Sequence, residues 1–184
     1  MAPARTLGLA LALATANTAF LTWRYLAVRH GWATPGTGIC SWTEWVDCDR
    51  VLQTAEARWF FVPNAVLGLG YFGGCWLGWR GVRATTGATY AAGCALLANV
   101  LAVGALASLW FLYLMTRLDA LCPLCPWNHL LAFVAAWAAR RTAAAAARSG
   151  STAPADRATL ARLFARSTAG GLAVVAAWWL ASGR

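Results

Sequence analysis

Four cysteines form two pairs whose spacing and surroundings indicate redox chemistry. Cys122 and Cys125 stand in a Cys-Pro-Leu-Cys motif that opens a long apolar run, and Cys40 and Cys48 lie in a polar loop. A thiolate attacks a disulfide, so two dithiols within reach of each other can exchange an electron pair. Because the motif lies at the edge of an apolar run, we expect the final electron acceptor to be a lipid-soluble molecule.

Two other interpretations of these cysteines remain open. Four thiolates can bind zinc, but zinc sites usually pair two short-spaced motifs, and seven residues separate Cys40 from Cys48. The Cys-X-X-Cys motif can also hold a structural disulfide, although so tight a ring is usually redox-labile. Cys75 and Cys94 lie inside apolar runs and are interpreted as packing residues. We therefore predict redox thiols and no metal.

The composition is that of an integral membrane protein. Of the 184 residues, 60% are hydrophobic and 11% are charged, and the mean hydropathy is +0.56. Soluble domains average about 25% charged residues. The net charge of +9 comes from fifteen arginines with no lysine. Because most arginines flank apolar runs, membrane topology explains them, and nucleic-acid binding is not predicted.

Five segments have the apolar length of about 20 residues that a spanning helix needs. They are Leu7–Val28, Trp59–Trp79, Ala88–Met115, Leu121–Ala139 and Leu160–Ala181. The first could be a signal peptide, but its apolar character continues to Val28, which favours a retained helix. We predict an all-α fold, a membrane four-helix bundle with a fifth transmembrane helix. The predicted parts are a core over 1–139 with an outer loop near 30–58, a cytoplasmic linker over 140–159, and the last helix over 160–184.

The arginines predict the orientation of these helices. Nine of the fifteen fall on the side that carries Arg5, and five of the six acidic residues fall on the other side. By the positive-inside rule the N-terminus is cytoplasmic. Both cysteine pairs then face outward, which in a bacterium is the periplasmic side of the cytoplasmic membrane, where disulfides persist.

The loop before the second span is expected to carry a short amphipathic helix on the membrane surface. Ser41 followed by Glu44 fits a capping box at its start. If most of the stretch from Cys40 to Cys48 is helical, these cysteines lie roughly 10 Å apart. A disulfide needs Cα atoms within about 7 Å, so bonding them would require that helix to unwind. We hypothesise that the loop moves between an oxidised form, in which Cys40 and Cys48 are bonded, and a form in which these cysteines pair elsewhere.

The Cys-Pro-Leu-Cys motif is expected to start the fourth span. Proline is favoured at the first helical position, which makes Cys125 the N-cap and Pro126 the first helical residue. The helix dipole and free amides then favour the Cys125 thiolate.

Two polar side chains near the motif are candidate ligand donors. His129 lies one turn after Cys125 on the same face, and Asn64 follows Pro63 at the outer end of the second span. Either can instead satisfy neighbouring backbone or a helix end. Asn128 points about 100° away from His129 and is given little weight.

Together these features resemble the bacterial, disulfide-forming branch of the vitamin K epoxide reductase family. The matching stretches are Cys40, Cys48-Asp-Arg-Val-Leu-Gln-Thr54, Phe61-Val-Pro-Asn64-Ala-Val-Leu-Gly68, and Leu121-Cys-Pro-Leu-Cys125 with His129. The resemblance covers about residues 7–139. The combination of paired loop cysteines with a Cys-X-X-Cys at the fourth helix is specific, whereas the motif alone is weak.

The resemblance implies a four-helix bundle around a quinone, of the ubiquinone or menaquinone type. Cys122 and Cys125 would be the active pair, with Cys125 nearest the quinone; Cys48 would exchange with Cys122, and Cys40 would meet the partner. Thr54 and Asn64 match family positions near the ring, while His129 replaces a tyrosine of mammalian members. The chain contains no thioredoxin-like domain, so such a partner is expected to be a separate protein.

The predicted activity is therefore quinone-dependent thiol oxidation that generates disulfides for a thioredoxin-like partner. Two alternatives are a reductase acting mainly on vitamin K epoxide and a non-enzymatic membrane subunit with structural disulfides. Assays with different quinones and with the epoxide would distinguish the first alternative from quinone-dependent thiol oxidation. Unreactive cysteines after mild reduction would favour the second.

Overall fold

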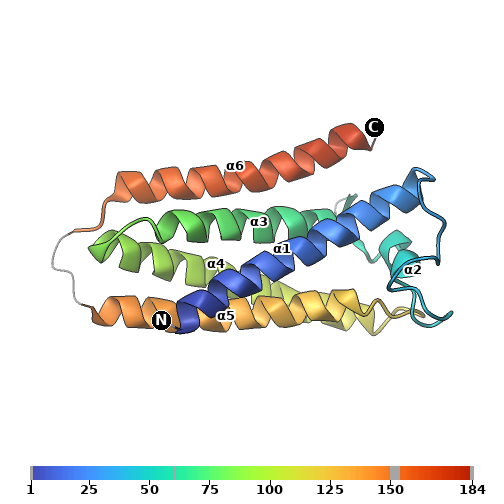
Figure 1. Ribbon diagram of the computed structural model, residues 1–184, viewed down its shortest axis with the longest axis horizontal. Helices are drawn as coiled ribbons and strands as arrows, with labels where there is room; N and C mark the ends of the chain where they lie inside the picture. Colours follow the sequence, from blue (N-terminus) through green and yellow to red (C-terminus); the bar gives the residue numbers. More distant parts are fainter. Residues whose placement is uncertain (1, 60, 150–153, 183–184) are drawn as a thin grey trace.

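The protein is built almost entirely from helices. The computed structural model describes residues 2–59, 61–149 and 154–182. Its long helices are α1 (Ala2–Arg29), α3 (Asn64–Val82), α4 (Gly87–Met115), α5 (Leu124–Arg148) and α6 (Arg157–Ala181). Figure 1 shows them lying side by side along one axis, with the short helix α2 (Cys48–Gln53) at one end. The prediction of an all-α membrane bundle is confirmed.

Four helices of the described chain are long and apolar enough to cross a membrane: α1, α4, α5 and α6. The second expected segment corresponds to α3, which is less apolar than these four helices. Six of the nineteen residues of α3 are glycine, and Asn64 and Arg80 lower its apolarity further. Helix α3 lies in the middle of the bundle, packed against α1, α4 and α6 (Figure 1). Contacts with other helices therefore replace much of its contact with lipid.

The boundaries of two expected segments also differ. The residues before α3 form a small hairpin of β1 (Arg58–Trp59) and β2 (Val62–Pro63), in place of the helical start expected at Trp59. At the other end, α5 continues through Arg148 and includes the first part of the expected linker. The division of the chain into core, linker and last helix stays a prediction.

The bundle core lies between α1, α3, α4 and α5. Leu11, Trp79, Leu97 and Ala135 are buried within one apolar cluster. Many members of the cluster are alanines, which let helices approach closely where lipid gives little hydrophobic driving force between them. This core fixes how the four helices pack against one another.

Helix α6 packs against α3 along a stripe of small residues. A Cβ atom at Gly70 would lie 2.8 Å from the Gly171 carbonyl oxygen, and one at Gly74 would lie 2.9 Å from the Ser167 carbonyl oxygen. Glycine at these positions therefore allows backbone contact between the two helices, the pattern of small-residue packing in membranes.

We expect Gly70→Ala to destabilise the packing of α6 on α3 by about 1–3 kcal/mol, because the added methyl group meets rigid backbone. Gly73→Ala is the matched control, since its Cβ atom would have its nearest contact at 3.9 Å, with Thr15. Thermal unfolding of both variants in the same detergent measures the difference. Equal midpoints would contradict the role assigned to the Gly70 contact.

Candidate active site at the capped end of the bundle

The loop after α1 carries a disulfide. Cys40 and Cys48 are bonded, with Cα atoms 5.7 Å apart, and both are buried. The expected helix across this stretch is wrong, because α2 begins only at Cys48. Asp47 is its N-cap and accepts from the backbone N–H groups of Asp49 and Arg50, while the Ser41 hydroxyl donates to the Asp47 carboxylate. Ser41 and Asp47 instead form an antiparallel bridge, and the turn between them brings Cys40 and Cys48 together.

This loop is paired with the segment that precedes the Cys-Pro-Leu-Cys motif. Val46 and Leu121 form a parallel bridge in which the Leu121 N–H donates to the Trp45 carbonyl oxygen at 2.7 Å. The Asp47 N–H donates to the Leu121 carbonyl oxygen at 3.1 Å. Cys48 and Cys122 directly follow these bonded residues, and both are fully buried in one apolar cluster. The two cysteine pairs are thereby brought to the same end of the bundle.

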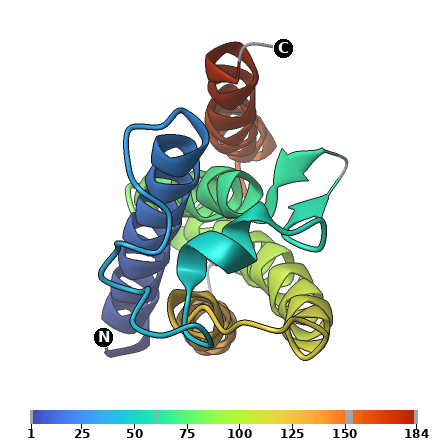
Figure 2. The ribbon, with the colours of Figure 1, turned by 90° about the vertical axis from the view of Figure 1, so that its right-hand side faces the viewer.

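A buried ion pair fastens the loop to α1. Arg24 donates from Nε to Asp49 Oδ1 at 2.7 Å and from Nη2 to Oδ2 at 2.6 Å. Asp49 Oδ2 also accepts from the Gly36 N–H, and Arg24 donates to the Thr34 carbonyl oxygen. This two-bond geometry is the strong form of a guanidinium–carboxylate contact. In Figure 2 the loop and α2 cover this end of the helices.

The Cys-Pro-Leu-Cys motif forms the first turn of α5. Helix α5 begins at Leu124 with Pro123 as its N-cap, so the expectation that Cys125 is the N-cap is wrong. The backbone N–H of Cys125 donates to the Cys122 carbonyl oxygen, and its thiol donates to the Cys122 sulfur at 2.7 Å. Both thiols are free in the structure. The turn therefore holds a dithiol with its sulfurs in contact.

The hydrogen bond from Cys125 lowers the pKa of the Cys122 thiol below its ordinary value. Burial and the nearby Asp49 carboxylate act in the opposite direction. The sequence interpretation favoured a thiolate at Cys125, whereas this geometry favours one at Cys122. A thiolate there is the form that exchanges with a disulfide.

We therefore expect thiolate absorbance from Cys122 to appear with a midpoint below the ordinary thiol value of about 8.5. The measurement uses a Cys40→Ala/Cys48→Ala background, so that the loop thiols do not contribute. Cys125→Ala should move the midpoint up by removing the donor, and Asp49→Asn should move it down by removing a negative charge. A midpoint at or above the ordinary value would contradict the prediction that a thiolate is favoured at Cys122. The variant Cys122→Ser identifies the part of the absorbance that comes from Cys122.

A cavity of about 410 Å³ lies directly inside this end. Apolar side chains form most of its wall, including Val51 and Leu52 of α2. Of the four cysteines in the two pairs, only Cys125 lines it. The size and the mainly apolar lining are typical of a site for a small organic molecule.

The predicted ligand residues divide into two groups. Asn64 and His129 both line the cavity, and the His129 ring stacks on Phe111 with centroids 6.1 Å apart. The Asn64 amide donates to the Glu56 carbonyl oxygen, while its buried Oδ1 has no partner among the described residues. Thr54 is not part of the cavity wall; it caps the end of α2, and its hydroxyl donates to the Val51 carbonyl oxygen.

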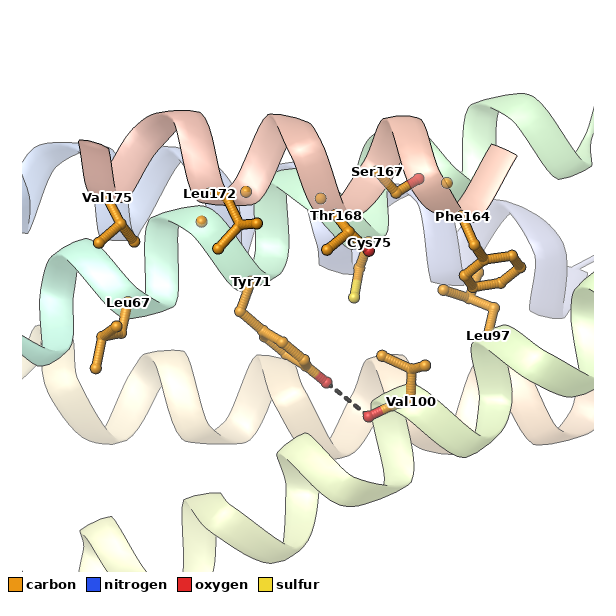
Figure 3. A pocket seen from close by; sticks show the side chains of 14 residues that line it. Leu67, Tyr71, Cys75, Leu97, Val100, Phe164, Ser167, Thr168, Leu172 and Val175 are labelled. Atoms are coloured by element: carbon orange, nitrogen blue, oxygen red, sulfur yellow. Dashed lines mark hydrogen bonds between the residues drawn. The ribbon is translucent and has the colours of Figure 1, made fainter. Parts of the chain in front are cut away.

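A second cavity of about 290 Å³ lies beside the first, between α3, α4 and α6. Figure 3 shows Tyr71 reaching across it from α3, with its hydroxyl donating to the Val100 carbonyl oxygen at 3.0 Å. Leu67 and Tyr71 line both cavities. The two cavities are therefore adjacent, and Tyr71 lies between them.

Sequence reasoning missed two contacts of this site. The Arg24–Asp49 pair joins residues 25 positions apart, and Asn17 of α1 contacts Asn128, which lines the cavity. The sequence did contain a signal for the Arg24–Asp49 pair, because an arginine inside an apolar run needs a buried partner. No local signal pointed to Asn128, because helical spacing alone gives no neighbour from another helix.

Comparison with known proteins agrees with this arrangement. The model of the family described as "Vitamin K epoxide reductase family" matches residues 6–140, which is more than half of the chain. Neither the curated proteins nor the solved structures include a match. Members of the matched family are oxidoreductases of the membrane that generally use thiols and a quinone. The chain belongs to the vitamin K epoxide reductase family.

Proposed function

We propose that this protein oxidises the thiols of a separate thioredoxin-like protein and passes the electrons to a quinone. Cys40–Cys48 accepts an electron pair from the partner, and Cys48 then exchanges with the Cys122–Cys125 disulfide. The resulting Cys122–Cys125 dithiol is oxidised back to the disulfide, and its two electrons and two protons convert the quinone to the quinol. Each turnover thus forms one disulfide in the partner and one quinol.

The observation that carries this proposal is the order of the sulfurs. Cys48 and Cys122 follow directly after hydrogen-bonded residues of two segments, and Cys125 is the cysteine of these pairs that reaches the cavity. This order supports a relay from the loop through the turn to a ligand. The bonded loop and the free thiols of the turn correspond to the stage at which the electrons have reached the turn.

The cavity fits a quinone by its chemistry as well as its size. A ring with two polar oxygens needs few polar partners in an apolar wall. The buried Asn64 Oδ1, which has no partner among the described residues, would accept from a quinol hydroxyl group. The apolar space beyond Tyr71 suits a lipid-soluble tail (Figure 3). Cys125 and His129 would lie beside the ring.

The loop must open before a partner can react with it, because Cys40 is 2% exposed and Cys48 is fully buried. We propose that residues 1–139 form the catalytic core, that 140–159 link it to the last helix at 160–184, and that the capped end faces the outside of a bacterial cytoplasmic membrane. The arginine distribution supports this orientation.

The test uses purified protein in lipid nanodiscs with a reduced thioredoxin-like dithiol protein as donor. Ubiquinone, menaquinone and vitamin K epoxide are supplied in separate reactions. We expect one quinol for each disulfide formed. Reduction of the epoxide alone would favour the reductase alternative, and absence of electron transfer to any acceptor would overturn the proposal.

A further inference from the structure

Asn17 of α1 contacts the first turn of α5 at two points. Its Nδ2 donates to the Leu124 carbonyl oxygen at 3.0 Å and contacts Asn128 Oδ1 at 3.4 Å. Leu124 directly precedes Cys125, and Asn128 lies three residues after it. A single carboxamide on α1 therefore contacts both sides of the turn that carries the reactive thiol.

These contacts determine which way the Asn128 amide points. A backbone carbonyl group only accepts, so Asn17 must direct its NH₂ group toward Leu124. The atom of Asn128 that faces this NH₂ group must then be its carbonyl oxygen. The Asn128 NH₂ group points the other way, and no protein acceptor pairs with it in the part of the chain that the structure describes. Asn128 lines the cavity beside Cys125 and His129.

We propose that Asn128 donates a hydrogen bond to a carbonyl oxygen of the quinone, and that Asn17 is the positioning residue that holds this donor in place. The inference rests on the proposed function and adds a ligand-binding residue to it. Quinone oxygens only accept, whereas the free atom of Asn64 in the same cavity is an acceptor. Asn128 therefore favours the oxidised ring, whose carbonyl oxygens are stronger acceptors than hydroxyl oxygens, and Asn64 Oδ1 accepts only from the hydroxyl groups of the reduced ring.

The test measures equilibrium binding of quinone and of quinol to the protein in nanodiscs, by quenching of tryptophan fluorescence. Asn128→Leu keeps a similar volume and removes the donor. We expect its dissociation constant for quinone to rise about tenfold, or about 1.4 kcal/mol, while that for quinol changes less. Asn128→Asp keeps the acceptor and loses the donor, so it should weaken quinone binding in the same selective way.

The variant Asn17→Leu tests whether Asn17 positions the Asn128 amide or only stabilises the bundle. Releasing the Asn128 amide should lower the affinity for quinone more than that for quinol, whereas general loosening of the bundle would lower both equally. Asn128→Gln should recover part of the quinone affinity, because it restores an NH₂ donor. Asn99→Leu is the matched control, since Asn99 is exposed on α4 and does not line the cavity.

The outcomes distinguish this inference from the proposed function. Quinone binding to the unchanged protein with no effect of Asn128→Leu would overturn the inference and leave the function standing. Failure of the unchanged protein to bind any quinone would overturn both. If Asn128→Leu does not fold, the comparison of Asn128→Asp with Asn128→Gln gives the same contrast, and equal quinone affinity of these two variants would sink the inference.

Discussion

Cys125→Ser is expected to abolish quinone reduction, with a rate loss of at least about 10³-fold. Serine cannot form a disulfide with Cys122, so the electron pair of the turn cannot be released. Cys125 is also the cysteine of the two pairs that lines the cavity. The measurement is a single turnover, in which chemically reduced protein is freed of reductant and mixed with quinone while quinol formation is followed.

Two further cysteine variants locate the defect within the relay. Cys40→Ser should reduce quinone in the single turnover but fail to accept electrons from the partner protein. Cys94→Ser is the matched control, because Cys94 is a buried free thiol of α4 that lines neither cavity. Reduction of quinone by Cys125→Ser at the rate of the unchanged protein would refute the order of the relay.

Asp49→Asn is expected to free the loop from α1. The substitution leaves the Arg24 guanidinium buried without a counter-charge, and breaking a buried pair in this way costs about 3–5 kcal/mol. Both loop sulfurs are buried, so a small dithiol reaches them only when the loop opens. The rate at which dithiothreitol reduces Cys40–Cys48 should therefore rise by at least about 100-fold, since about 1.4 kcal/mol corresponds to a factor of ten.

Two controls test whether the buried charge is the cause. Glu44→Gln makes the same change at an exposed carboxylate of the same loop and should leave the reduction rate nearly unchanged. Arg24→Met/Asp49→Leu removes both charges and leaves neither unpaired, so its effect should be smaller than that of Asp49→Asn. A reduction rate of Asp49→Asn equal to that of Glu44→Gln would show that the ion pair does not hold the loop closed.

The loop shows where sequence reasoning met its limit. The spacing of Trp45, Cys48 and Leu52 fits an amphipathic helix, but Trp45 is 73% exposed and lies outside α2. Asp47 caps the helix instead of Ser41, and the residues before it pair with Leu121. The bridge between Val46 and Leu121 and the Cys40–Cys48 disulfide together outweigh a helical preference that is weak over so few residues.

The sequence by itself predicted the apolar helices, the grouping of four cysteines into two pairs, and the position of His129 and Asn64 near the Cys-Pro-Leu-Cys motif. Length, apolarity and motif spacing are local properties, so they can be read along the chain. Only the tertiary structure decided that Val46 pairs with Leu121, that Arg24 pairs with Asp49, and that Asn17 orients Asn128. Those contacts join segments 25 to 111 positions apart. Which distant partners meet depends on how the helices pack, and local spacing does not encode that.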